Sequence, residues 1–85
     1  MRLLGKEKLQ IELDADARIW LRSWIAELSC AHWKNAADVL VQFPRATFMS
    51  PDTFIFRVGA AGWSIELAVH FPLGIALVVG MVQAT

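Results

Sequence analysis

The sequence predicts a small α+β domain, in which two main N-terminal helices pack on one face of a three- to four-stranded antiparallel sheet. Two observations predict this fold. Apolar residues recur with the helical period in the first half of the chain, and they alternate with a period of two in the second half. The 85 residues have room for one domain, 1–85, whose helical half spans about 6–43 and whose sheet half spans about 53–82.

An apolar stripe after Asp14 predicts the first helix. Its members are three or four residues apart: Ala17, Trp20, Leu21, Trp24 and Leu28. Asp14 and Asp16 stand at its start, where a carboxylate accepts hydrogen bonds from free amide groups and interacts favourably with the helix dipole. A second helix is expected from Asn35 to Phe43, because Asn35 is a good N-cap and Pro44 cannot continue a helix.

Four segments are predicted to be strands. They are 1–4 as a short edge strand, 53–58, 63–71 and 75–82, separated in the second half by turns at 50–52, 59–62 and 72–74. Segment 63–71 alternates apolar and polar residues without an error, which is typical of a half-buried strand. The last strand is apolar on both faces, which is typical of a central or covered strand. Segment 6–13 is ambiguous and fits one or two helical turns.

Charge and cysteine content restrict the function classes. Eight basic and eight acidic residues cancel, so charge alone does not indicate a nucleic-acid binder. The single cysteine, Cys30, allows no intrachain disulfide and no cysteine-based zinc site, which favours a reducing, cytoplasmic location. His32 and His70 lie in different halves, and we expect neither a metal nor a cofactor.

Neither end of the sequence has the pattern of a signal peptide or of a membrane-spanning helix. Residues 1–13 carry five charges instead of an apolar core, so no signal peptide is expected. The clean apolar stretch 73–82 is about half of the roughly 20 residues that a spanning helix needs. We therefore expect no membrane segment.

The polar face of the third predicted strand is a candidate active face. Ser64, Glu66 and His70 project from the same side, and Arg57 lies on the equivalent face of the neighbouring strand. Glu66 and His70 are four residues apart, so their Cα atoms are about 13 Å apart. That distance is too long for two groups that act on one proton, but the pair could flank an extended substrate. The alternative interpretation is the solvated face of a sheet.

Three basic residues are candidates for phosphate binding. Lys34, Arg45 and Arg57 could line one rim, although a balanced charge is also typical of an ordinary surface. Trp33 and Trp63 could stack on bases, or they could belong to the core.

A longer series of landmarks runs from the first helix into the sheet. It comprises Leu21-Arg22-Ser23-Trp24, Glu27, Trp33-Lys34 with Asp38 in the run Ala31–Val39, the step Phe43-Pro44-Arg45-Ala46, Phe48, and the strand that reads FIFRV at 54–58. With Met1-Arg2-Leu3-Leu4 as the opening strand, this pattern resembles HigB-type toxins of the RelE-like superfamily, which belong to type II toxin–antitoxin systems. The resemblance covers about 1–82 and is tightest from 20 to 59.

The resemblance implies a compact α+β fold and an mRNA interferase. Such toxins cut translated mRNA at the ribosome and are neutralised by a HigA-like antitoxin. Basic side chains on the sheet would hold the phosphates and stabilise the charge that develops as a 2′-hydroxyl attacks. Lys34, Arg45 and Arg57 are the basic residues that the resemblance retains for RNA binding.

The sequence departs from the family where the activity resides. The family carries an Asn-x-Tyr-Arg segment entering the third strand, and the register puts Trp63 at the aromatic position and Ser64 at the arginine. The family's Thr-His-x-x-Tyr ending falls on Met81, Val82 and Thr85. A hydroxyl cannot supply the bidentate cation that a phosphate contact needs. We therefore expect degraded or lost cleavage and assign no catalytic residue.

Two other interpretations stay open. The chain could be a non-catalytic interaction module that binds a HigA-like antitoxin or self-associates through the edge of its sheet. It could also be a remnant truncated after Thr85, without a selected function.

Overall fold

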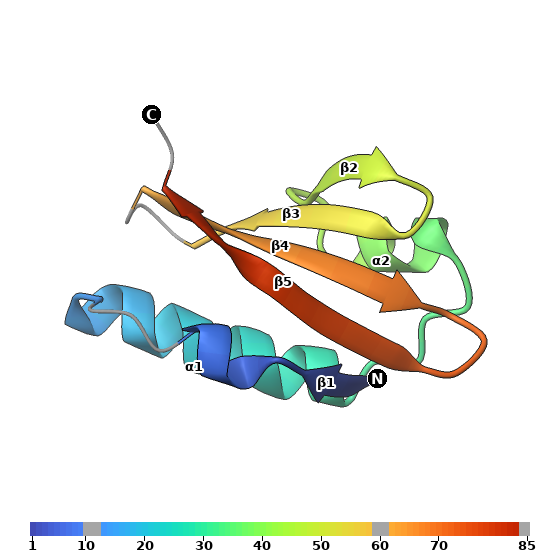
Figure 1. Cartoon of the computed structure of the whole chain (residues 1–85), viewed down its shortest axis with the longest axis horizontal. Helices are drawn as coiled ribbons and strands as arrows, with labels where there is room; N and C mark the ends of the chain where they lie inside the picture. The colour runs from blue at the N-terminus through green and yellow to red at the C-terminus, as the bar shows by residue number, and fades with distance from the viewer. Residues whose placement is uncertain (10–12, 59–61, 84–85) are drawn as a thin grey trace.

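The strands form a single mixed sheet in the computed structural model, which describes residues 1–9, 13–58 and 62–83. The sheet has five strands in the order β1-β5-β4-β3-β2 (Figure 1). Their bounds are Arg2–Leu4 for β1, Thr47–Ser50 for β2, Thr53–Arg57 for β3, Trp63–His70 for β4 and Ile75–Gln83 for β5. Three of the four neighbouring pairs in this order are antiparallel, and the fourth, β1 with β5, is parallel.

Two helices and a short 3-10 helix complete the described elements. The 3-10 helix η1 spans Lys6–Leu9, α1 spans Ala15–Ser29 and α2 spans Ala36–Gln42. Both predicted N-caps are confirmed. Asp14 Oδ1 accepts a hydrogen bond from the Ala17 amide at 2.7 Å, and Asn35 Oδ1 accepts one from the Asp38 amide at 3.1 Å. The ambiguous segment 6–13 thus contains one 3-10 turn, and its residues 10–12 lie outside the described part.

One hydrophobic core lies between α1 and the inner face of the sheet. The predicted stripe of α1 supplies Ala17, Leu21, Trp24 and Leu28, all of which are buried, while Trp20 is partly buried. The inner residues of the strands include Leu3, Phe54, Phe56, Ile65, Leu67, Val69, Ala76 and Val78. Trp24 meets Phe56 edge to face at 5.4 Å, which joins the helix to β3.

The prediction of a three- to four-stranded antiparallel sheet is wrong in two respects. The chain forms a further strand, β2, which joins β3 through the turn at Pro51 and Asp52. The sheet is also mixed, because β1 pairs with the last strand in parallel. A parallel pair needs a long crossover between its strands, and the whole intervening chain provides it.

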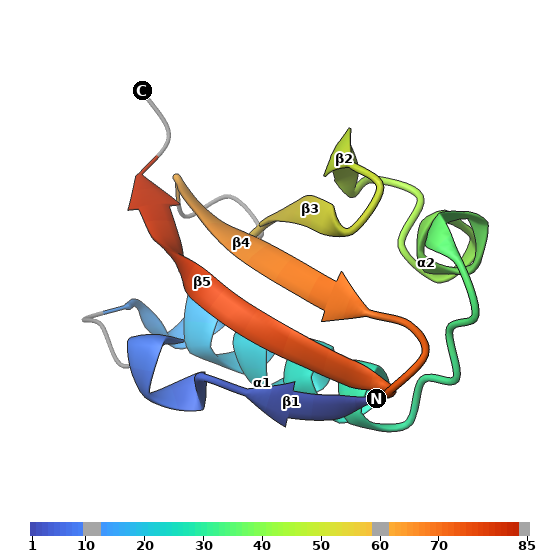
Figure 2. The same ribbon diagram turned by 45° about the vertical axis from the view of Figure 1, so that its right-hand side comes forward.

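The helices do not lie together on the sheet as predicted. α1 runs along β1 and β5, whereas α2 lies at the other side of the molecule beside β2 and β3 (Figures 1 and 2). The reason is topological. Only four residues separate α2 from β2, and β2 is the edge strand farthest from β1.

The turns before and after β4 are the predicted segments 59–62 and 72–74. The turn at 71–74 is confirmed, with Gly74 at φ 65° and its amide bonded to the Phe71 carbonyl at 3.1 Å. The predicted loop 59–62 lies outside the described residues except for Gly62. Its strands are closed by a bond from the Val58 amide to the Trp63 carbonyl at 2.8 Å. Neither α1 nor α2 has the length and apolar character needed to cross a membrane.

Candidate nucleic-acid interface

Three outward-facing residues form a row across β3, β4 and β5. Ser64 of β4 is the direct cross-strand partner of Arg57 on β3 and of Val82 on β5. Direct partners in an antiparallel pair have Cβ atoms about 4.5–5.5 Å apart. We call Arg57, Ser64 and Val82 the cross-strand row. The prediction that Arg57 shares a face with Ser64 is confirmed by this register.

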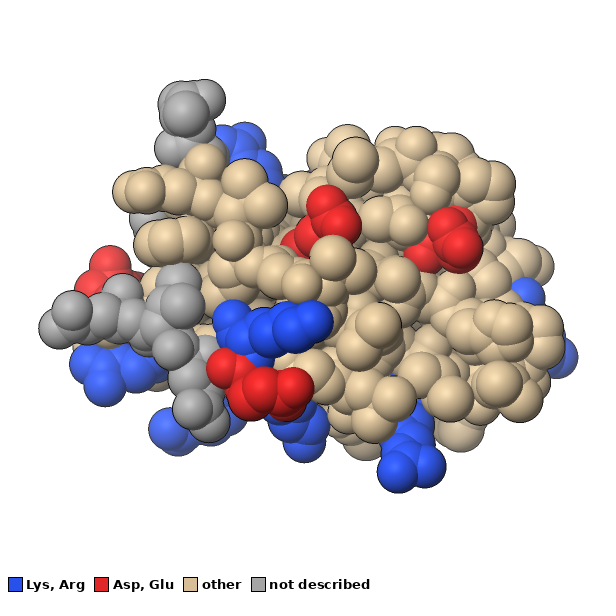
Figure 3. Space-filling model, in the orientation of Figure 1, with Lys and Arg blue, Asp and Glu red and all other residues tan. Residues whose placement is uncertain are grey.

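The row belongs to a sheet face that no described helix covers. We call it the helix-free face, and its apolar members are Leu4, Ile55, Ala68, Ile75, Leu77, Val79 and Val82. Leu77 is 41 % exposed and Val82 is 54 % exposed. In Figure 3 this side is a broad surface of uncharged residues with few charged side chains on it. The interpretation of a mainly polar, solvated face therefore applies only to part of it.

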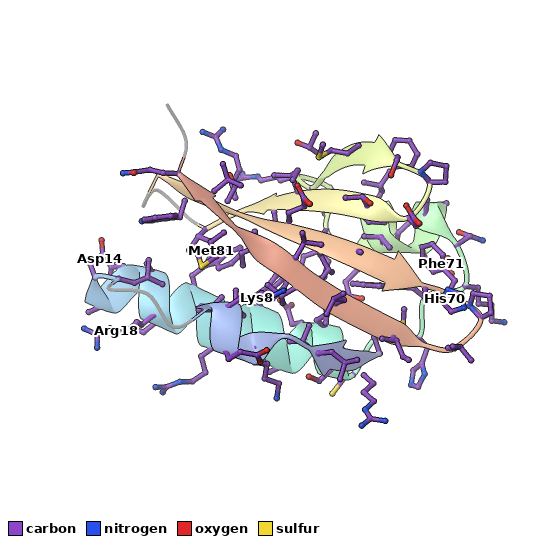
Figure 4. All side chains as sticks on the ribbon, in the orientation of Figure 1. Lys8, Asp14, Arg18, His70, Phe71 and Met81 are labelled. Atoms are coloured by element: carbon purple, nitrogen blue, oxygen red, sulfur yellow. The ribbon has the colours of Figure 1, made fainter. Side chains whose placement is uncertain are left out.

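Glu66 and His70 share this face but do not form one site with Ser64. Glu66 is half-buried between Ile55 and Gly80, its partners on β3 and β5. His70 is exposed at the far end of β4, where Figure 4 shows it beside Phe71. His70 lies six positions after Ser64 along the strand, which corresponds to about 20 Å between their Cα atoms. These three residues consequently cannot act on one reacting group.

A hollow of about 630 Å³ opens at the edge of β3, next to the first residue of β2. β2 pairs with Thr53–Ile55 and leaves the edge of Phe56 and Arg57 without a neighbouring strand. α1 and the α2–β2 connection form the other walls. We call it the β3-edge hollow, and it is lined by Trp20, Gln42, Phe43, Pro44, Arg45, Ala46, Phe56 and Arg57.

The hollow brings together two of the three predicted basic residues. Arg45 and Arg57 both line it, and no described lining residue carries a carboxylate. No side-chain hydrogen bond within the described residues involves either guanidinium. A guanidinium has five N–H donors and no acceptor, which suits it to bind an anion. Arg57 also belongs to the cross-strand row, so the hollow and the row adjoin.

Lys34 lies apart from this pair. It precedes the N-cap of α2, and its amide donates to the Asp38 carboxylate at 2.8 Å. Arg45 follows the other end of α2, whose seven residues are about 10 Å long. The predicted rim of three basic residues thus reduces to Arg45 and Arg57.

The aromatic residues at the hollow are not the predicted ones. Trp33 is 5 % exposed and donates its indole N–H to Gln42 at 2.9 Å, so it belongs to the core. Trp63 packs against the core on the inner face. Trp20 and Phe43 line the hollow instead. Trp20 stands at the margin of the α1 stripe, the position from which a side chain reaches the edge of a core.

Comparison of the chain with protein-family models and with curated proteins returns no match. No described group of three His, Cys, Asp or Glu side chains could hold a metal ion. The described site offers two guanidinium groups, the hydroxyl of Ser64 and three aromatic rings, those of Trp20, Phe43 and Phe56. That combination suits binding of a phosphate-bearing aromatic ligand better than acid–base chemistry.

Proposed function

We propose that this chain is a HigB-like toxin component of a type II toxin–antitoxin system, of the mRNA interferase class, with degraded cleavage. The cross-strand row is the observation that carries the proposal. The resemblance assigns an arginine to the position of Ser64 and a histidine to that of Val82, from two separate sequence motifs. The sheet register makes these two positions direct partners.

The coincidence supports the proposal because the two motifs are aligned independently of each other. A register slip of one residue would put either position on the opposite face of the sheet. Arg57, a basic residue that the resemblance retains, completes the same row. The opening strand that the resemblance requires corresponds to β1.

The chemistry of the row explains how the chain could bind RNA without cleaving it efficiently. Attack by a 2′-hydroxyl builds negative charge on the phosphate, and cations positioned around it stabilise that charge. At this row the chain keeps one guanidinium, on Arg57, and has a hydroxyl and an isopropyl group at the other two positions. RNA held at Arg45 and Arg57 would still lack a cation at the position of Ser64 and a proton-transfer group at the position of Val82. A HigA-like antitoxin and the ribosome are the partners that this function implies.

Growth of bacteria that express the chain tests the proposal. We expect no arrest with the native sequence, and arrest with the combined Ser64→Arg, Val82→His and Thr85→Tyr substitutions. His70→Arg with Ile75→His is the matched control, because this pair is also directly opposed on β4 and β5 but lies at the far end. Adding Arg57→Ala to the restored chain should abolish arrest. Arrest by the control pair alone, or none after restoration, would contradict the proposed active row.

A second candidate function is a non-catalytic interaction module, which would bind a HigA-like antitoxin or a second copy. The helix-free face favours it, since contiguous exposed apolar surface is typical of protein-binding sites. The sheet edges favour it less. β1 has three residues and β2 has four with a register shift between Phe48 and Ser50, and short or bulged edges resist further pairing.

A further inference from the structure

Two aromatic rings of the β3-edge hollow are held in place by their neighbours. The indole of Trp20 stacks on Trp24 with centroids 6.2 Å apart and planes 12° from parallel. Phe43 makes edge contacts with Trp33 at 6.0 Å and with Phe56 at 5.3 Å. Because the rings are fixed before a ligand arrives, a planar group that packs on them costs little further side-chain entropy.

The charge of the hollow complements a phosphate group. Arg45 and Arg57 enter its lining from different segments, the α2–β2 connection and the end of β3. A guanidinium binds phosphate oxygens through two parallel N–H donors and also packs on flat rings. Aromatic rings next to such cations are the arrangement by which proteins bind single-stranded nucleic acids.

We propose that the β3-edge hollow binds one nucleotide of a single-stranded RNA. The base packs against Trp20 and Phe43, and the phosphate lies at Arg45 and Arg57. The volume of about 630 Å³ falls within the roughly 300–1,000 Å³ of small-molecule sites. This inference rests on the proposed function for RNA as the ligand. It goes beyond that function by placing a base-binding subsite next to the cross-strand row. The residues of this subsite lie outside the two motifs in which the sequence differs from the toxin family.

The lining also indicates how selective the subsite is. Gln42 is the one amide side chain in it, and each end of that amide already makes one hydrogen bond that fixes its orientation: Oε1 accepts from Trp33 at 2.9 Å and Nε2 donates to the backbone carbonyl of Glu27 at 3.4 Å. The remaining lining side chains are apolar or arginine. We therefore expect weak base preference. Bases in a duplex are already stacked on each other, so the subsite should prefer single strands.

Fluorescence anisotropy of the full chain with a short fluorescein-labelled single-stranded RNA tests the subsite. We expect Trp20→Leu to weaken binding about tenfold, as loss of a stacking contact does. Trp20→Phe should retain most of the affinity, because it keeps an aromatic face. Phe48→Leu is the matched control: Phe48 is 49 % exposed on β2 and lies outside the hollow. The same strand annealed to its complement should bind more weakly.

Other results would overturn the subsite in distinguishable ways. If Trp20→Leu binds RNA normally while Arg45→Gln and Arg57→Gln weaken it, the hollow holds no base but the RNA-binding function stands. If adenosine monophosphate binds and RNA does not, RNA is the wrong ligand. If neither binds, both proposals fall.

Amide chemical shifts of the native chain provide a measurement without substitution, should Trp20→Leu fail to fold. RNA should perturb the amides of Arg45, Ala46, Phe56 and Arg57. Shifts confined to the surroundings of His70 and Gly74, at the other end of β4, would overturn the assignment.

Discussion

Ser64 and Val82 are direct cross-strand partners on β4 and β5, with Arg57 opposite Ser64 on β3. Neither Ser64 nor Val82 carries a charge, so the cation of this row belongs to Arg57 alone. The same arginine borders the β3-edge hollow. In the proposed HigB-like function, Arg57 therefore connects RNA bound in the hollow with the positions of Ser64 and Val82.

The first prediction concerns the salt dependence of RNA binding. Each phosphate contact that a basic residue makes adds to the slope of log affinity against log salt concentration, because counterions are released. Arg57→Gln should reduce the magnitude of that slope by about one unit. Arg22→Gln, which changes an exposed arginine of α1 outside the hollow, should leave it unchanged. Equal slopes for the native chain and Arg57→Gln would show that Arg57 contacts no phosphate.

The second prediction concerns two glycines with similar backbone angles. Gly5 has φ 81° and Gly62 has φ 78°, so alanine is strained at both. A Cβ on Gly5 would lie 2.8 Å from the Val78 carbonyl oxygen, whereas one on Gly62 would meet nothing within 4 Å. Gly62→Ala should cost about 1 kcal/mol of unfolding free energy. Gly5→Ala should cost about 1–3 kcal/mol more because of the clash.

Urea denaturation of both variants checks this difference. Equal losses of stability would mean that β5 moves away from position 5 without cost. Such a result would contradict the close packing of η1 and β1 against β5 that the fold requires.

The elements that could be predicted are those in which buried residues recur with a strand or helix period, because that period is visible in the sequence. β3 and β4 bury every second residue against α1, and the α1 stripe buries four of its five members. β2 has no fully buried residue, so it leaves no such pattern and forms through pairing with β3. No local pattern predicts that β1 runs parallel to β5, because its three residues, Arg2–Leu4, pair with residues about 73 positions later in the sequence.

The part of the candidate site that lies on neighbouring strands could be predicted from the sequence. The part that is formed by segments distant in the sequence could not. Alternation correctly put Arg57 and Ser64 on one face. The hollow gathers residues from α1, the α2–β2 connection and β3, and no spacing along the chain connects Trp20 with Arg45 or Phe56. For the same reason, Lys34 was grouped with Arg45 although α2 separates them.

The third prediction concerns the N-cap of α1. Asp14 Oδ1 bonds to the Ala17 amide at 2.7 Å, and without it that amide lacks a protein partner. Asp14→Ala should lower the unfolding free energy by about 1 kcal/mol. Asp14→Asn should lower it much less, because asparagine keeps an accepting oxygen. Thermal or urea unfolding separates the two. Equal losses would assign the effect to the charge of Asp14 and its interaction with the helix dipole rather than to the cap.

The last prediction tests the interaction module. Leu77 is 41 % exposed in the middle of β5 on the helix-free face, so a lysine there would add a charge where a partner must dock. We expect Leu77→Lys to remain folded and to self-associate less than the native chain in sedimentation velocity measured over a range of concentrations. Leu73→Lys is the matched control, since Leu73 is 70 % exposed in the turn at 71–74 and lies off that face. If the native chain is a monomer throughout and its helix-free face also fails to bind a HigA-like antitoxin, the interaction module is excluded.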